Sequence, residues 1–440
     1  MFNKYKPGGN GVGACSIAAR RAKNRRATVC VRGTDQCFPC QPFMGQKTNL
    51  LNACLAANMS EPPPIWSHEN FNPQNTRQSM LNGIESYETT ETWKFTPDAE
   101  NQHFNENQLV IGKTGIIYTI DNGGTIYALV DNGGSFSVLF SRSTGYSSLR
   151  PPTIGLDNIM YFSATNTVKS ITKINTSSPS IGWTFTSTSL SSPFEMTSPY
   201  PPIIGDYGNL FVSTTNGYIV AINKKNGALL WTYHSSTNNF IYLAIGYNGV
   251  IYAVENGTSK LVAISQLGGV LWTLTTTTRF SSFSVPVIGR DGTIYVVSSE
   301  KVWAFTDNGH SGSEKWGLTV DSTLNRSISI GGLNNRLYVS YGSHVAAITD
   351  NVTSGQINWS IDVGVAGITD ITIGRNGTLY FSSAYTRLTS VSDLGDTAII
   401  NWAEYVDAGG NSSSCAIGLN GTIYFGGDHS MVLARGTLPP

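Results

Sequence analysis

Cysteine is the residue type best placed for chemistry in this chain, because five of its six copies lie within the first 60 residues. They are Cys15, Cys30, Cys37, Cys40 and Cys54. Cys37 and Cys40 have the Cys-x-x-Cys spacing that zinc sites and disulfides both use. A structural zinc site needs a second such pair or nearby histidines, and the first histidine of the chain is His68. Cys37, Cys40, Cys30 and Cys15 are therefore the candidate metal ligands, with zinc, disulfides and free thiols all left open.

Known catalytic and ligand-binding motifs are missing from the rest of the sequence. The six histidines show no His-x-His or His-Glu-x-x-His spacing, and there is no Gly-x-Ser-x-Gly elbow or phosphate-binding loop. Asp-Asn-Gly-Gly occurs at Asp121 and at Asp131. This sequence could suggest a calcium site, but Asp, Asn and Gly are above all the residues that form tight turns, so we predict turns at both places. We predict no catalytic residue, no cofactor-binding residue and no cofactor, so the chain is not expected to be an enzyme.

Charge is distributed unevenly along the chain. Residues 1–60 carry nine lysines and arginines against the single acid Asp35, although the whole chain has 28 basic and 28 acidic residues. Within this basic arm, SIAARRAKNRRA predicts a short helix capped by Ser16. Such an arm favours a partner with an acidic surface. The predicted partner-binding residues are Arg20, Arg21, Lys23, Arg25, Arg26 and Arg32.

A protein lattice, a nucleic acid or a layer of lipid headgroups would each offer the arm an acidic surface. Nucleic acid is less favoured, because no aromatic residues interleave the arginines to stack on bases. No stretch approaches the roughly 20 apolar residues of a transmembrane helix, and no secretion signal is present. We therefore expect protein partners in a larger assembly and no membrane span, and the localisation stays open.

One motif recurs through most of the chain. It reads Ile-Gly-x-x-Gly-x-[Ile/Leu]-[Tyr/Phe] with small variations, and its copies follow one another at intervals of 41 to 50 residues. The eight copies begin at Ile111, Ile154, Ile204, Ile245, Ile288, Ile330, Ile373 and Ile417. The central Asp-Gly or Asn-Gly pairs suit a hairpin turn between two short strands. Regular self-similarity of this length indicates a repeat architecture.

Each unit continues with a third alternating run, such as GYIVAIN, and then with a run centred on tryptophan, such as LLWTY. In the first unit Phe140 is expected at the tryptophan position. Four strands per repeated unit predict a β-propeller, whereas a solenoid would leave open ends that need capping repeats. The predicted blade-packing residues are Trp93, Trp183, Trp231, Trp272, Trp316, Trp359 and Trp402.

The two ends of the repeat region complement each other. The last unit stops after its third strand, and the segment ETWKF with Trp93 stands alone before the first motif. We therefore expect an all-β, eight-bladed β-propeller over residues 87–436, made of four-stranded antiparallel blades and closed by this N-terminal strand. Residues 1–60 form the basic, cysteine-rich arm with short helices, and 61–86 a Pro/Asn-rich, irregular linker.

The units resemble the PQQ-type propeller repeat, and GYIVAINKKNGALLW is the best match, through Ala221, Gly227 and Trp231. The resemblance implies that Trp231 sits in the groove between neighbouring blades. Quinoprotein dehydrogenases of this type carry adjacent cysteines and long insertions that build a cofactor chamber, and this sequence has neither. The non-catalytic scaffold branch is the better match, although its lipoprotein signal and cysteine are missing here.

These features favour a non-catalytic platform for protein–protein interaction, or a structural role in a larger assembly, anchored through the basic arm. A minor capsid- or virion-associated protein is one such component. The alternatives are a quinoprotein-like enzyme or small-molecule binder that uses the central channel, and a soluble assembly chaperone that adds strands at a blade edge.

Overall fold

The structure, a computed structural model, separates the chain into two compact units, residues 1–59 and 60–440. It describes residues 28–30, 37–39, 67, 71–84, 93–97, 109–147, 150–190, 194–197, 200–205, 208–235, 241–255, 258–277, 279–280, 285–320, 322–324, 328–331, 336–384, 387–405, 414–426 and 431–433. In the first unit the described residues form one antiparallel pair, β1 (Thr28–Cys30) and β2 (Cys37–Pro39).

In the second unit the described residues form eight four-stranded antiparallel sheets, numbered here in chain order. Sheet 1 holds β4 (Val110–Ile111), β5 (Ile117–Ile120), β6 (Thr125–Asp131) and β7 (Phe136–Ser143). Sheet 2 holds β8 (Thr153–Ile154), β9 (Met160–Ala164), β10 (Thr167–Thr172) and β11 (Ser180–Thr186), followed by the short 3₁₀ helix η1 (Ser187–Ser189). Sheet 3 holds β12 (Ile203–Ile204), β13 (Asn209–Ser213), β14 (Tyr218–Asn223) and β15 (Leu229–His234). Sheet 4 holds β16 (Ile241–Ile245), β17 (Ile251–Glu255), β18 (Lys260–Ile264) and β19 (Val270–Thr275).

The second half of the chain repeats the pattern. Sheet 5 holds β20 (Val287–Ile288), β21 (Ile294–Val297), β22 (Lys301–Asp307) and β23 (Gly312–Thr319). Sheet 6 holds β24 (Ser329–Gly331), β25 (Arg336–Tyr341), β26 (His344–Asp350) and β27 (Gly355–Asp362). Sheet 7 holds β28 (Thr372–Ile373), β29 (Leu379–Ser383), β30 (Arg387–Asp393) and β31 (Ala398–Tyr405). Sheet 8 holds β32 (Ala416–Ile417), β33 (Ile423–Gly426), β34 (Met431–Leu433) and β3 (Lys94–Phe95).

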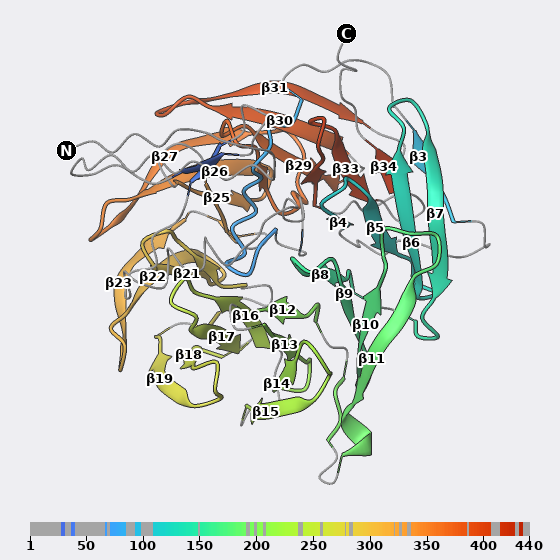
Figure 1. Ribbon diagram of the computed structural model, residues 1–440. Helices are drawn as coiled ribbons and strands as arrows, with labels where there is room; N and C mark the ends of the chain where they lie inside the picture. Colours follow the sequence, from blue (N-terminus) through green and yellow to red (C-terminus); the bar gives the residue numbers. More distant parts are fainter. Residues whose placement is uncertain are drawn as a thin grey trace, which may run out of the picture. The chain divides into compact units, whose positions relative to one another are not determined.

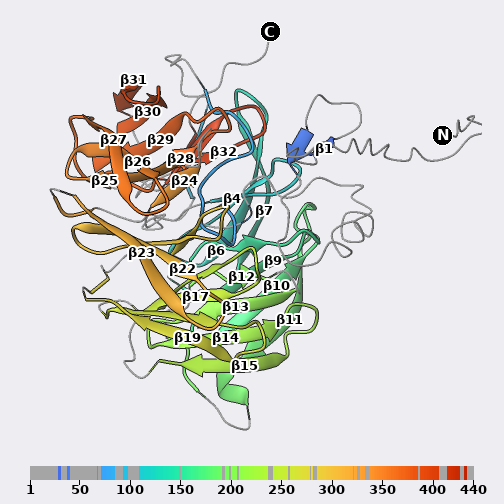
Figure 2. The same cartoon turned by 90° about the vertical axis from the view of Figure 1, so that its left-hand side faces the viewer.

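The sheets follow one another around a common centre in chain order, with the first strand of each sheet innermost (Figure 1). Figure 2 shows the same arrangement from the side, where β12 to β15 lie next to one another and β15 is outermost. The predicted all-β propeller of four-stranded antiparallel blades is therefore confirmed. The tryptophan runs form the outermost strands, as their place at the end of each repeat unit requires.

The N-terminal strand completes the last sheet. β3 pairs antiparallel with β34, with Lys94 opposite Val432 and Phe95 opposite Met431. Sheet 8 thus takes three strands from the end of the chain and its outermost strand from a segment before the first repeat. The ETWKF segment docks where the sequence predicted.

Burial explains the motif. The second strands, such as β5 and β9, are buried along their whole length because sheets pack against both of their faces. Their tyrosines are the largest fully buried side chains, among them Tyr118, Tyr252 and Tyr338. The outermost strands alternate between exposed and buried positions instead, because one of their faces meets solvent. Cys415, the sixth cysteine of the chain, is buried, and its burial raises the pKa of the thiol.

Residues 61–86 were expected to be an irregular linker. The described part, Ser67 and residues 71–84, contains no helix or strand, only one bridge between Gln78 and Ile373. It also packs against the innermost strands, which the sequence did not predict. This stretch, Ser67 with residues 71–84, is called the central segment below.

Replacing Phe95 in β3 with alanine is expected to destabilise the protein by about 3–5 kcal/mol, the cost of emptying a buried phenylalanine site. Phe95 is buried and its ring lies 5.0 Å from that of Tyr127 and 5.5 Å from that of Phe136. Urea unfolding followed by tryptophan fluorescence measures the change. The control is Thr96→Ala, an exposed position beside it, and equal unfolding midpoints for the two variants would contradict the docking of β3.

Candidate functional site

The central segment forms a ladder of backbone hydrogen bonds with the innermost strands. The first isoleucine of the repeated motif donates its N–H to the segment in five sheets. The donors and acceptors are Ile154 to Ser67 (2.9 Å), Ile245 to Pro73 (2.8 Å), Ile288 to Gln74 (3.0 Å), Ile330 to Thr76 (3.1 Å) and Ile373 to Arg77 (3.0 Å). In Figure 1 the segment is the blue trace near the middle of the sheets. The first strands, from β4 and β8 to β32, are called the inner rim below.

The segment also reaches the opposite side of the centre. Phe71 packs into the cluster formed by sheets 8 and 1, around Trp93 and Ile111, whereas Pro73 is bonded to sheet 4. Two residues later in the chain, Asn75 is fully buried. The segment therefore crosses the middle of the sheets between Phe71 and Pro73 and then follows the inner rim.

Asn75 joins two neighbouring sheets through its side chain. Its Nδ2 donates to the carbonyl oxygens of Leu243 in sheet 4 and of Pro286, next to β20 in sheet 5, each at 2.9 Å. Gln74 adds a bond from its Nε2 to the carbonyl of Ile245 at 2.9 Å. A buried carbonyl without a donor costs about 1–3 kcal/mol, so these amides satisfy groups that the sheets alone leave open.

Arg77 does the same for the next two sheets. Its Nη1 donates to the carbonyl of Ile328 at 2.8 Å, and its Nη2 lies 3.3 Å from Oδ2 of Asp370. The Ser414 hydroxyl, from sheet 8, donates to the same carboxylate oxygen at 3.3 Å. The side chain of Arg77 is 3% exposed and that of Asp370 is 10% exposed, so the pair is buried and tolerated because each charge meets the other.

Three residues of the segment adopt the left-handed backbone conformation. The φ angles are 77° at Phe71, 58° at Asn75 and 56° at Arg77. This conformation suits asparagine but costs other side chains on the order of 1 kcal/mol or more, and such residues cluster where the surroundings over-determine the backbone. Here the side-chain hydrogen bonds of Asn75 and Arg77 hold the backbone of these two residues in the left-handed conformation.

The last part of the segment fits closely against sheet 7. The Leu81 carbonyl accepts the N–H of Arg375 at 3.0 Å, and the Ile84 carbonyl accepts the hydroxyl of Tyr380 at 2.9 Å. A Cβ added at Gly83 would come within 2.6 Å of the Tyr380 ring, so only glycine fits beside it. The described residues of the segment, Ser67 and 71–84, therefore follow the inner rim closely.

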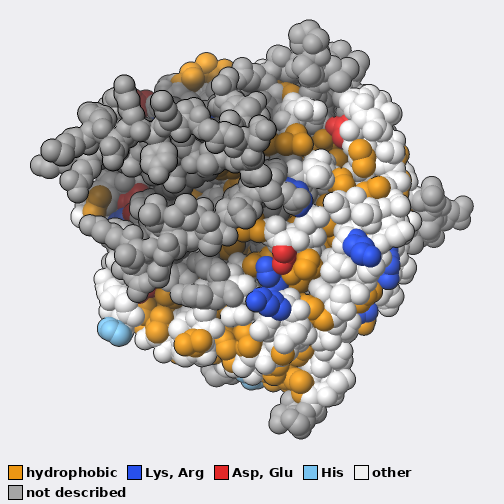
Figure 3. Space-filling model, in the orientation of Figure 1, with side chains coloured by type: hydrophobic (Ala, Val, Ile, Leu, Met, Phe, Trp, Pro, Cys, Tyr) orange, Lys and Arg blue, Asp and Glu red, His pale blue; other side chains and the backbone are white. Residues whose placement is uncertain are grey.

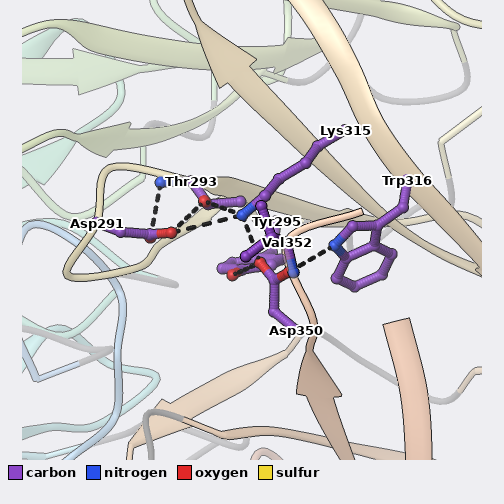
Figure 4. A network of polar contacts seen from close by, with 7 residues as sticks. All are labelled: Asp291, Thr293, Tyr295, Lys315, Trp316, Asp350 and Val352. Carbon is purple, nitrogen blue, oxygen red and sulfur yellow. Dashed lines mark hydrogen bonds and ion pairs between the residues drawn. The ribbon is translucent and has the colours of Figure 1, made fainter. Parts of the chain in front are cut away.

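A second recurring arrangement joins the sheets further out. Trp316 of sheet 5 donates from Nε1 to Oδ1 of Asp350 in sheet 6 at 2.9 Å, and Tyr295 donates its hydroxyl to Oδ2 at 2.7 Å (Figure 4). Lys315 lies 2.7 Å from the same Oδ2, and the N–H of Val352 donates to Oδ1 at 2.7 Å. This pattern of one carboxylate between a tryptophan and a tyrosine is called the carboxylate clasp below.

Electrostatics keep the clasp ionised. Burial alone would raise the pKa of Asp350, but the hydrogen bonds from Lys315, Tyr295, Trp316 and the Val352 N–H outweigh it and hold that pKa below its usual value. Burial and the same carboxylate raise the pKa of Tyr295, which stays a hydrogen-bond donor. The charge on Asp350 is thus structural, and nothing in its surroundings prepares it for proton transfer.

The predicted blade-packing tryptophans lie where their own sheet meets the next one. Clasps recur with Trp93, Asp131 and Tyr424; with Trp272, Asp307 and Tyr252; and with Trp359, Asp393 and Tyr338. Trp183 and Trp231 donate instead to the backbone carbonyls of Lys224 and Gln266, and Trp402 belongs to a buried cluster that also holds Ile417 and Phe425 of sheet 8. Phe140 lies opposite Ala128, the register that Trp231 has with Ala221, so it occupies the expected tryptophan position.

The residues expected to meet a partner or a metal fall mostly outside the described part of the chain. That applies to Arg20, Arg21, Lys23, Arg25, Arg26, Arg32, Cys15 and Cys40. Cys30 and Cys37 stand opposite each other in the β1–β2 pair. Among the described residues, no three His, Cys, Asp or Glu side chains are grouped to hold a metal ion, and no helix is long and apolar enough to cross a membrane.

Residues 84–241 and 169–404 match the family model described as outer membrane protein assembly factor BamB, which covers more than half of the chain. The chain belongs to this family. The resemblance to the PQQ-type propeller repeat, seen at Ala221, Gly227 and Trp231, is thereby confirmed. No curated protein matches the chain by sequence.

Solved structures with the same fold include proteins of different function. BamB from Moraxella catarrhalis is 14% identical, with a TM-score of 0.57, over 80% of this chain and 99% of that one. A europium-containing methanol dehydrogenase is 11% identical, with a TM-score of 0.59, over 85% of this chain and 91% of that one. The quinohemoprotein alcohol dehydrogenase from Comamonas testosteroni is 10% identical, with a TM-score of 0.62, over 88% and 83%. At these identities the likeness shows the fold alone, and the fold serves both an assembly factor and dehydrogenases.

Changing Asp350 to asparagine is expected to destabilise the protein by about 3 kcal/mol at neutral pH, because Lys315 then loses its buried counter-charge. The pKa of Asp350 is lowered by folding, so its stabilisation is present above the ordinary carboxyl pKa of about 3.9 and is lost as the pH falls through the lower, folded value. Urea unfolding of both proteins between about pH 7 and about pH 2 should show the difference shrinking with acid.

The matched control is Asp291→Asn, whose carboxylate lies 3.5 Å from Nζ of the same lysine but is 54% exposed. That exposed pair should contribute less than about 0.5 kcal/mol. Equal losses at both positions, or a pH-independent loss at Asp350, would show that the clasp does not work through charge.

Proposed function

We propose that the chain is a non-catalytic platform for protein–protein interaction in a larger assembly. In this proposal the eight four-stranded sheets are the eight blades of one closed ring, and the basic residues 1–60 hold the ring in the assembly. A minor capsid- or virion-associated component fits this description. The family description, an outer membrane protein assembly factor, supports protein partners, as does the shared fold with BamB.

The occupied centre is the observation that carries the proposal. A small molecule bound by the backbone groups of the inner rim would have to compete with the central segment for them. In this structure the buried side chains of Asn75 and Arg77 donate hydrogen bonds to inner-rim carbonyl oxygens. The acceptors are Leu243, Pro286 and Ile328. With the middle filled by its own chain, the molecule has its faces and outermost strands left for binding, and these are surfaces for other proteins.

The exposed surface also suits protein partners. Among its described residues, the face in Figure 3 shows many hydrophobic side chains and few charged ones. Protein interfaces are depleted of charged residues at their cores, because charged side chains cost more free energy to remove from water. A face with few charges therefore has a small desolvation cost when a partner covers it. Exposed aliphatic side chains recur on the outermost strands, at Val138, Ile181, Leu230, Val270, Leu271, Ile357, Ile399 and Ile400.

The platform role is tested with the full-length protein in its native complex. Cross-linking mass spectrometry should connect residues 1–60 to a repeating structural protein. Changing Arg20, Arg21, Arg25 and Arg26 to glutamine should release the protein at a lower salt concentration, because counterion-dependent contacts weaken with lost charge.

The matched control neutralises four exposed basic residues of the sheets, Lys173, Lys225, Arg279 and Arg375. It should leave the complex intact. Release by the control variant to the same degree, or no cross-links from the arm, would rule out anchoring through residues 1–60.

The enzymatic alternative makes an opposite prediction for cofactor binding. Incubating the purified protein with pyrroloquinoline quinone and calcium should produce no saturable change in absorbance and no dye reduction with alcohols. We expect this because the central segment occupies the inner rim with buried hydrogen bonds. Saturable binding accompanied by turnover would overturn the platform proposal.

A further inference from the structure

The inner rim presents the same hydrogen-bonding groups in each repeat. The motif isoleucine offers its N–H, as at Ile245, Ile288 and Ile330. The carbonyl two residues earlier accepts a side-chain donor, as at Leu243, Pro286 and Ile328. The innermost strand is a sheet edge, and an edge is a template for an added peptide.

Where the central segment does not supply the donor, the sheets supply their own. The carbonyl of Pro202 accepts the hydroxyl of Thr153 from the preceding sheet at 2.6 Å, and that of Cys415 accepts the hydroxyl of Thr372. These carbonyls hold the same position in their repeats as Leu243, Pro286 and Ile328. In these two repeats the sheets satisfy the carbonyl themselves, whereas at Leu243, Pro286 and Ile328 the segment provides the donor.

The central segment matches this array as a bound peptide would. Four successive sheets, 4 to 7, each donate an N–H to a carbonyl of the segment. The acceptors are Pro73, Gln74, Thr76 and Arg77, so the segment advances by roughly one residue for each sheet. Asn75 and Arg77 turn their side chains to the three carbonyls and to Asp370. Main-chain bonds thus provide the fit, and two side chains provide the selectivity.

We propose that the inner rim is a peptide-binding site, that its ligand is the chain's own central segment, and that the Asn75-Thr76-Arg77 sequence is what the site recognises. The segment is held by these contacts, independently of its covalent connection to β3. A peptide of the same sequence can therefore take its place, which a mere linker would not allow.

The first test cuts the chain between the segment and β3. A specific protease site is inserted between Glu88 and Thr89 of the full-length protein, so that cleavage leaves Trp93 and β3 with the sheets. After cleavage, residues 1–88 should co-elute with the remainder on size exclusion. Immediate separation of the two fragments would overturn the proposal.

The second test separates the rim contact from any contact of the arm. The same cut is made in a protein carrying Asn75→Ala and Arg77→Ala, and its N-terminal fragment should dissociate with an affinity lower by about 100-fold, as expected from losing three hydrogen bonds and an ion pair. Unchanged retention of this fragment would place its attachment elsewhere and contradict the proposal.

A peptide competition keeps the inference testable if the double variant fails to fold. The cleaved wild-type protein is incubated with a labelled synthetic peptide of residues 65–86, or with the same peptide carrying both alanines. The wild-type peptide should replace the fragment, and the control should need about 100-fold more. Equal competition by the two peptides, or incorporation of neither, would refute recognition through Asn75 and Arg77.

Discussion

Every sheet in this protein has two edges, and the backbone groups on an edge must find partners. In a propeller the outer edges face water, but the inner edges converge where water is scarce and an unpaired N–H or C=O is costly. The central segment pairs the inner edges of five sheets through the N–H groups of Ile154, Ile245, Ile288, Ile330 and Ile373. In these five sheets the arrangement of the other strands depends on this pairing, because each of the five begins at the strand that the segment holds.

The outer edges are handled differently. In sheets 1 to 7 the register of the outermost strand shifts next to its aromatic residue, as between Ala304 and Phe305 opposite Trp316. Such a bulge interrupts the ladder and twists the edge, which hinders the addition of a foreign strand. The aromatic ring also leaves its own sheet and packs against the next one, so one irregularity protects the edge and fastens neighbouring sheets together.

Two kinds of hydrogen-bond acceptor join neighbouring sheets at these tryptophans. Carboxylate clasps stand at Asp131, Asp307, Asp350 and Asp393, whereas Trp183 and Trp231 bond to backbone carbonyls. A carboxylate can accept from a tryptophan, a tyrosine and a backbone N–H at once, so it makes a stronger contact, but one that depends on ionisation. The carbonyl contacts between sheets 2, 3 and 4 carry no charge and do not share this dependence.

The repeated elements of the fold could be predicted from the sequence, whereas the contacts of the central segment could not. The strands, the tryptophan positions and the docking of β3 follow from local periodicity and from an end that lacks a strand. The central segment has no periodicity, and its contacts join residues far apart, such as Asn75 and Pro286, which are 211 positions apart. Its polar composition resembles that of a linker, and only an arginine and two asparagines close together within it hinted at buried partners.

The place of the central segment in the chain also changes how the arm must be studied. Residues 1–60 precede it, and β3 follows it. Removing everything before Glu85 would delete the arm and also expose the carbonyls of Leu243, Pro286 and Ile328, so a lost partner could reflect a damaged ring. Substitutions within the arm leave those hydrogen bonds in place. Anchoring and ring integrity are therefore separable only when the central segment is kept, because it belongs physically to the sheets although it lies outside the repeats.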